Sequence, residues 1–156
     1  MDAKTLTVTT TYDLSSKGGT CAALAMDVKN HILFAGCRNP QTMVILNADN
    51  GNIITSLPLG MGTDGAVFNP STMETFSSQG DGTMTVIKES SPTSFSVEQN
   101  VETTASAKTL TLDSKTNHLL LIAAEFGPPP ANPQPGKGPA RGPMVAGSFS
   151  ILVVGK

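Results

Sequence analysis

Few side chains in this sequence carry reactive chemistry: the 156 residues include two histidines, two cysteines, one tyrosine and no tryptophan. The cysteines offer the clearest reaction. A hairpin that turns about Lys29 would place Asp27 opposite His31 and Cys21 opposite Cys37, within reach of a disulfide. The sequence therefore predicts either a stabilising disulfide, which indicates an oxidising compartment, or two buried, reduced thiols. A change of register by one residue would separate the sulfur atoms.

The other motifs fit turns better than catalytic or binding sites. Residues 60–65 match the G-x-G-x-x-G pattern of dinucleotide-binding loops, but a strand ending at Pro70 follows where a helix is required. Residues 47–52 resemble the start of a calcium loop, yet the glycine is one position early and the chelating glutamate is missing. His31 and His118 each follow an asparagine in a turn, and neither has the further ligands of a zinc site. We therefore expect no metal and no cofactor.

The composition predicts one folded domain. Apolar residues make up 38% and charged residues 14% of the chain, whereas disordered chains have the opposite balance. The net charge of −2 excludes an electrostatic surface for duplex nucleic acid. The longest apolar run, residues 119–124, is far shorter than the roughly 18 residues of a membrane span. The N-terminus has no signal-peptide pattern, so the chain either stays where it is made or is a piece of a longer precursor.

An internal repeat organises these elements. Three similar segments end at Asp27, Asn69 and Asp113, which are spaced by 42 and 44 residues. Each is followed by short apolar stretches rich in Val, Ile, Thr and Phe and separated by turn residues, which is typical of strands. The predicted strands are residues 22–27, 32–35, 43–46 and 53–57, then 64–69, 75–78, 84–87 and 94–97, then 108–113, 119–122 and 149–154. Four short strands in this period predict an all-β chain of β-propeller blades with almost no helix.

One segment resembles a known family. Residues 30–60, which read NHILFAGCRNPQTMVILNADNGNIITSLPLG, resemble a YVTN-type repeat, with its "vyVtN", "ntVsViD" and "vxatIpvG" strands in order. The chain as a whole is similar to the C-terminal half of a YncE-like exported bacterial β-propeller, within the WD40/YVTN repeat-like superfamily. This resemblance implies a propeller fold and a periplasmic or secreted location, but it does not fix an activity, because propellers host many unrelated ones.

The repeat also predicts how residues 1–156 divide within a single propeller segment. Residues 1–19 would hold the last strand of a preceding blade, at 6–12, and an inter-blade loop. Residues 20–60 and 61–105 would be complete blades. Residues 106–156 would be a blade that lacks its fourth strand and carries a proline-rich surface loop at 127–147, which is a tolerated insertion, a docking peptide or a lid.

These twelve expected strands make three blade equivalents, too few for a closed ring, since propellers usually have about four to eight blades. We therefore predict that the chain belongs to a longer propeller or forms a homodimer. In a homodimer, the N-terminal strand of one copy would complete the last blade of the other.

The usual blade order gathers polar side chains at one mouth of the propeller, where loops before the first strand and between the second and third strands meet. The residues predicted to line that mouth are Lys17, Arg38, Asn39, Asp64, Asp81, Lys108 and Glu125. They do not form the converging ligand set of a metal-dependent lactonase. We therefore predict a non-enzymatic binding or scaffold module for a small molecule or peptide. The alternative is a propeller enzyme component, a lactonase-like hydrolase or a quinoprotein-type dehydrogenase, with its site at the same mouth.

Overall fold

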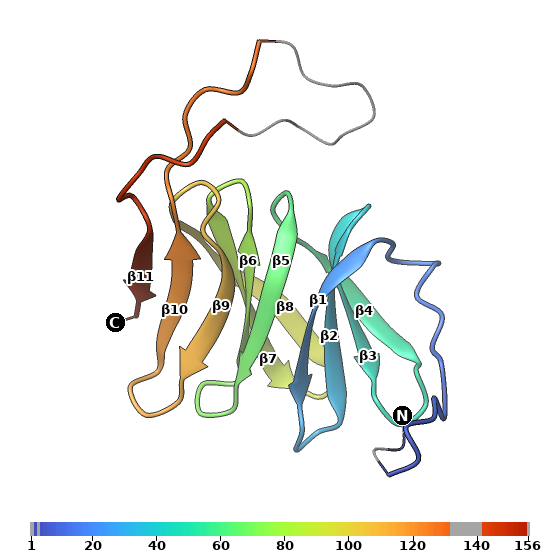
Figure 1. Cartoon of the computed structure of the whole chain (residues 1–156). Helices are drawn as coiled ribbons and strands as arrows, with labels where there is room; N and C mark the ends of the chain where they lie inside the picture. The colour runs from blue at the N-terminus through green and yellow to red at the C-terminus, as the bar shows by residue number, and fades with distance from the viewer. Residues whose placement is uncertain (1, 3, 132–141, 156) are drawn as a thin grey trace.

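The computed structural model describes residue 2, residues 4–131 and residues 142–155, and these form eleven strands in three antiparallel sheets with no helix (Figure 1). The first sheet contains β1 (Cys21–Asp27), β2 (Ile32–Arg38), β3 (Gln41–Asn47) and β4 (Ile53–Pro58). The second contains β5 (Thr63–Asn69), β6 (Glu74–Gln79), β7 (Thr83–Ser91) and β8 (Ser94–Glu102). The third contains β9 (Lys108–Asp113), β10 (His118–Ala123) and β11 (Ser150–Val154). The predicted all-β architecture of blade-like sheets is confirmed.

Each sheet is a meander in which strands that follow one another in sequence pair with one another. The first strands of neighbouring sheets pack side by side, β1 against β5 and β5 against β9, as the inner strands of propeller blades do. No helix in the described part of the chain has the length and apolar character needed to cross a membrane.

The core lies between the sheets. Phe34, Met43 and Ile45 of the first sheet are fully buried against the second sheet, and Phe34 contacts the rings of Phe68 and Phe95 with centroids 5.7 and 5.9 Å apart. A second cluster between the second and third sheets contains the buried side chains of Phe76, Met84, Val86, Leu119 and Leu121. Alternation along each strand thus supplies apolar side chains to both faces of the middle sheet, which explains why these strands carry little charge.

The strand predicted at residues 6–12 is not formed within the single chain, where residues 8–14 have no strand partner, so its place in a preceding blade stays a prediction. A fourth strand needs the third strand of its own blade as a hydrogen-bonding partner, and the described chain has none beside this segment. Tyr12 and Leu14 pack instead on the outward face of the first sheet, and the Tyr12 hydroxyl donates a hydrogen bond to the Ala48 carbonyl at 3.0 Å.

The register of the β1–β2 hairpin also differs from the prediction. Asp27 lies opposite Ile32 rather than His31, because the turn spans residues 28–31 and is not centred on Lys29. His31 closes this turn with a positive φ of 55°, and its Nδ1 lies 2.8 Å from Asp49 Oδ1. The hairpin is therefore shifted by one residue from the expected pairing.

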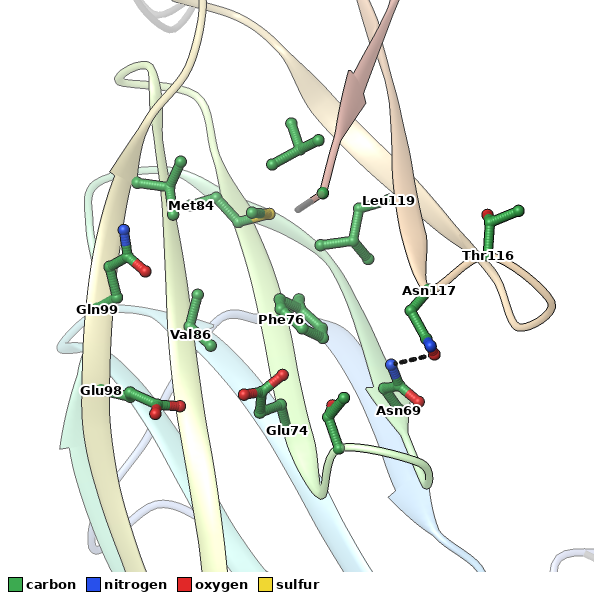
Figure 2. Close-up of a pocket in the computed structure, with 14 residues that line it drawn as sticks. Asn69, Glu74, Phe76, Met84, Val86, Glu98, Gln99, Thr116, Asn117 and Leu119 are labelled. Carbon is green, nitrogen blue, oxygen red and sulfur yellow. Dashed lines mark hydrogen bonds between the residues drawn. The ribbon is translucent and has the colours of Figure 1, made fainter.

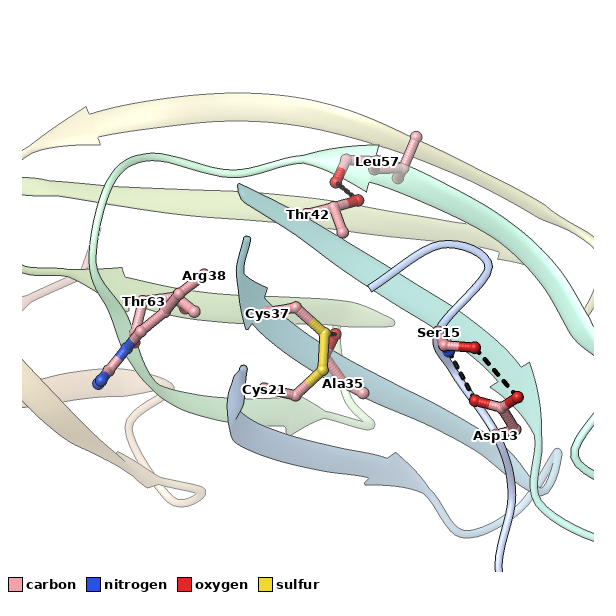
Figure 3. Close-up of a disulfide and its surroundings, with 9 residues drawn as sticks. All are labelled: Asp13, Ser15, Cys21, Ala35, Cys37, Arg38, Thr42, Leu57 and Thr63. Atoms are coloured by element: carbon pink, nitrogen blue, oxygen red, sulfur yellow. Dashed lines mark hydrogen bonds between the residues drawn. A yellow bond between two sulfur atoms is a disulfide. The ribbon is translucent and has the colours of Figure 1, made fainter. Parts of the chain in front are cut away.

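A β-bulge compensates for this shift at the far end of the same hairpin. The pairing changes register between Cys21 and Ala23, so that Ala22 is the extra residue and Cys21 lies opposite Cys37 after all. The two sulfur atoms are 1.99 Å apart and form a disulfide (Figure 3). Two deviations from the simple hairpin thus cancel at the cysteines.

The proline-rich segment 127–147 leaves the third sheet after β10 and returns before β11 (Figure 1). Its two described ends are held together by hydrogen bonds from Gly127 N to Pro143 O at 2.8 Å and from Val145 N to Glu125 O at 2.9 Å. Residues 132–141 of this predicted loop lie outside the described residues.

Candidate functional site

Asp64 is the centre of a polar cluster at the end of the sheets from which the 127–147 segment leaves. The pairing of β5 with β6 changes register between Thr63 and Gly65, so Asp64 is the extra residue of a β-bulge. A bulge re-aims the side chain that it carries, and such irregularities are common beside functional sites. The Asp64 side chain remains 23% exposed, so solvent and ligands reach it.

Two cations from different sheets share this carboxylate. Arg38, at the end of β2, places Nη2 3.0 Å from Asp64 Oδ1 and donates from Nε to the Thr63 carbonyl at 2.8 Å. Lys108, at the start of β9, has its Nζ 3.6 Å from the same Oδ1. The Thr109 hydroxyl donates to Asp64 Oδ2 at 2.9 Å. Residues from three successive sheets therefore meet at one carboxylate.

The charges of this cluster favour recognition over stabilisation. The Arg38 and Lys108 side chains are 40% and 34% exposed, and ion pairs that solvent reaches so easily contribute only about 0–1 kcal/mol to folding. Two positive groups facing one negative group leave a net positive charge at the surface. The cluster can therefore attract an anionic group.

The remaining predicted mouth residues do not join this cluster. No hydrogen bond or ion pair within the described residues connects Asp64 to Lys17, Asn39, Asp81 or Glu125. Asp81 instead closes a turn, where Oδ2 accepts a hydrogen bond from Met61 N at 2.6 Å and Oδ1 accepts one from the Thr83 hydroxyl at 2.7 Å. The structure thus brings together Arg38, Asp64 and Lys108.

Thr109 is a member of the cluster that the sequence did not indicate. It lies where the β9–β10 pairing changes register and has a positive φ of 62°, which turns its hydroxyl towards Asp64. Nothing in a run of alternating Thr and Leu marks this position in advance. Only its neighbour Lys108 was predicted to line the mouth.

A pocket of about 680 Å³ lies between the second and third sheets (Figure 2). Phe76, Met84 and Val86 line one wall, and Leu119 and Val154 line the other. Polar groups surround this apolar interior, including a hydrogen bond of 3.0 Å from Asn69 Nδ2 to Asn117 Oδ1 and the carboxylates of Glu74 and Glu98. The sequence did not predict this pocket, because it depends on how far two sheets diverge.

A buried carboxyl pair occupies the opposite end of the first two sheets. Asp27 and Glu89 are 2% and 3% exposed, and Asn30 Nδ2 donates to both, at 2.6 Å to Asp27 and 2.9 Å to Glu89. Burial raises the pKa of Glu89, and the neighbouring Asp27 charge adds to this effect, although the Asn30 hydrogen bond opposes it. This pair joins the sheets and is closed to solvent. In the described residues, no group of three His, Cys, Asp or Glu side chains could hold a metal ion.

Comparisons with known proteins identify the fold. No protein-family model matches the sequence, and no significant relative is found among curated proteins. Among solved structures, hydrazine synthase of Kuenenia stuttgartiensis matches with a TM-score of 0.57 at 11% identity, over 67% of this chain and 30% of that one. A chain of the mitotic checkpoint complex matches with a TM-score of 0.56 at 14% identity, over 64% of this chain and 33% of that one.

A third match is the β-propeller domain of Cps50 (Swd1) from Myceliophteria thermophila, with a TM-score of 0.44 at 10% identity, over 80% of this chain and 57% of that one. The chain spans about a third of the length of the first two structures. At such low identity the first two likenesses concern the fold alone. The chain is an all-β segment of β-propeller type, built from three blade-like sheets.

Proposed function

We propose that this chain is part of a β-propeller binding module, similar to the YncE-like proteins, and that its mouth binds an anionic group at Arg38, Asp64 and Lys108. The convergence of these side chains from three sheets on one carboxylate carries the proposal. Two cations and a threonine hydroxyl contact Asp64, so the site gathers charged and hydrogen-bonding groups of the kind used for recognition.

Arg38 provides the geometry for recognition. Its Nε and Nη2 bind the Thr63 carbonyl and Asp64, and within the described residues its Nη1 makes no hydrogen bond. The guanidinium edge formed by Nη1 and the second hydrogen of Nη2 can bind carboxylate or phosphate oxygens through two parallel hydrogen bonds. Lys108 supplies a second positive charge beside the same Asp64 oxygen. The expected ligand therefore carries a carboxylate or phosphate group.

Titration with inorganic phosphate and with citrate, followed by NMR of the backbone amides and the Arg38 side chain, tests this site. Arg38→Gln and Lys108→Gln should each weaken binding about fivefold or more, since a unit charge at contact distance contributes at least about 1 kcal/mol. Lys115→Gln is the matched control, because Lys115 is exposed in the β9–β10 turn at the opposite end of the sheet. Equal affinities for all three variants would overturn the proposal.

We also propose that the protein works in an oxidising compartment, as expected for an exported family. The Cys21–Cys37 disulfide supports this, because such bonds persist mainly outside the reducing cytosol. Alkylation of thiols in cells quenched with acid should label neither cysteine unless a reductant is added first. Labelling of both cysteines without reductant would contradict an oxidising location.

A further inference from the structure

The outer edge of β11 and the pocket beside it form an incomplete blade. In the first and second sheets a fourth strand, β4 or β8, pairs with the third strand, whereas β11 pairs with β10 alone among the described strands. The 680 Å³ pocket opens next to this edge, between Val154 of β11 and the β8 residues Glu98, Gln99 and Val101. Unpaired edges of this kind readily accept another strand.

The second sheet shows what a fourth strand does at the equivalent place. Phe95 and Val97 of β8 point towards the first sheet and pack on its apolar cluster. Phe95 meets Phe34 edge to face, with ring centroids 5.9 Å apart, and Phe34 has no exposed surface. The fourth strand of one blade thus closes the core that it shares with the blade before it.

Phe76 is the counterpart of Phe34 in the next blade. Phe34 lies opposite Ala25 in the first sheet, and Phe76 lies opposite Val67, the residue 42 positions later, in the second. No fourth strand of the third sheet covers Phe76 in the described chain. It remains 9% exposed and lines the pocket together with Met84 and Val86 (Figure 2).

The N-terminal segment has the side-chain pattern that would fill this place. Residues 5–8 (TLTV) repeat the order of hydroxyl and apolar side chains in residues 94–97 (SFSV) of β8. Tyr12 then corresponds to Val101: Tyr12 packs on the first sheet, and Val101 packs on the cluster shared with the third. Leu6 and Val8, the counterparts of Phe95 and Val97, are each 74% exposed.

One chain cannot bring these two parts together. The N-terminal segment runs along the outward side of the first sheet, and β11 lies at the other end of the row of sheets (Figure 1). A second copy can do so. If the first sheet of one copy sits beside the third sheet of the other, residues 8–12 lie where a fourth strand belongs. Residues 4–7 form a turn, with Leu6 at a φ of 55° and a bridge between Asp2 and Thr7, and must extend to continue that strand.

We propose that residues 5–12 of a second copy pair with β11 and insert Leu6 and Val8 into the pocket, against Phe76 and Val86. Charge complementarity supports this orientation, because Lys4 precedes the strand and the pocket is lined by Glu74 and Glu98. Two such contacts related by a two-fold axis close a ring of six blades, within the range of about four to eight that propellers use.

Analytical ultracentrifugation of the 156-residue chain over a range of micromolar concentrations tests this contact. The wild type should be a dimer, and Leu6→Asp combined with Val8→Asp should weaken dimerisation by about 100-fold, because charges would enter an apolar pocket. Val28→Asp combined with Met61→Asp is the matched control, since these turn residues are 71% and 60% exposed and lie outside the proposed contact. Circular dichroism should show that both variants fold.

A synthetic peptide of residues 4–12 provides the second measurement. It should bind the Leu6→Asp and Val8→Asp variant, whose β11 edge is free, and should compete with dimerisation of the wild type. A wild-type chain that stays monomeric at micromolar concentration would overturn a second copy as the source of the strand, whatever the peptide does. A dimer unaffected by Leu6→Asp and Val8→Asp would overturn the proposed contact.

Discussion

Loss of the Cys21–Cys37 disulfide should lower the stability of the chain by an amount that follows from its position. The cysteines are separated by 16 positions, so the bond closes a loop of 17 residues with both cysteines counted. Restricting an unfolded loop of this length contributes about 3 kcal/mol at 25 °C in the chain-entropy treatment. In a protein of this size each 1 kcal/mol shifts Tm by about 2–4 °C, so reduction should lower Tm by about 6–12 °C.

The two cysteines allow the cross-link to be separated from packing. Cys21 is exposed, whereas Cys37 is fully buried beside Ala35, Val44 and Leu46. Cys21→Ser therefore removes only the bond, and its Tm should match that of the reduced wild type. Cys37→Ser also buries a hydroxyl among apolar side chains, which costs a further 1–3 kcal/mol or so when no hydrogen bond compensates.

Thermal unfolding of the wild type and both variants, with and without a phosphine reductant, measures these differences. Reductant should change the wild type alone, and the order of Tm should be wild type, Cys21→Ser, then Cys37→Ser. Two free thiols titrated in denatured, unreduced protein would refute the disulfide. A wild-type Tm that is insensitive to complete reduction would refute the entropic estimate.

Three further predictions concern other parts of the chain. Gly18→Ala should destabilise by about 1–3 kcal/mol in urea unfolding, because the added Cβ would lie 2.6 Å from Cys37 Sγ and 2.8 Å from Val44 Cγ2; an unchanged midpoint would contradict this packing. Burial raises the pKa of Glu89 above its ordinary 4.5. The contribution of Glu89 to the free energy of unfolding is therefore greatest below the unfolded-state pKa and is lost as the pH rises through the folded-state pKa. Glu89→Gln should lack that decline in urea midpoints measured from about pH 4 to 7, and an identical pH profile in both proteins would refute the assignment. Asp64→Asn leaves two cations without their carboxylate and should tighten phosphate binding about fivefold or more in the NMR titration, whereas weaker binding would show that Asp64 positions the cations.

The sequence predicted the strands well wherever a strand finds its partner nearby along the chain. Each sheet is a meander, so the spacing of Asp27, Asn69 and Asp113 was enough to place the strands in between. The strand predicted at residues 6–12 is not formed within the single chain, because no third strand lies beside this segment in the described residues. β8 extends to Glu102, beyond the predicted 94–97, because an outer strand pairs through its backbone even where its side chains are polar.

The candidate site was predictable only in part, for a related reason. Blade order places the loops of Arg38, Asp64 and Lys108 at one mouth. Their polar side chains and their positions in these loops were therefore enough to predict that they line it. The bulges at Asp64 and Thr109 decide which side chains finally meet, and a bulge is one extra residue that the alternation of apolar and polar positions does not reveal. The pocket between β8 and β11 arises from the relative placement of two sheets, which no local pattern records.

The hydrogen bonds between Gly127 and Pro143 and between Glu125 and Val145 give the proline-rich segment a closed neck. The residues of β10 and β11 that pair lie on the sheet side of these hydrogen bonds. The number of residues inserted between Gly127 and Pro143 should therefore have little effect on the stability of the sheet. Each doubling of such a loop costs only about 0.6 kcal/mol. A fluorescent domain or an affinity tag inserted between residues 131 and 142 would therefore leave the blade intact, which makes this segment a handle by which the protein can be labelled or immobilised next to its mouth.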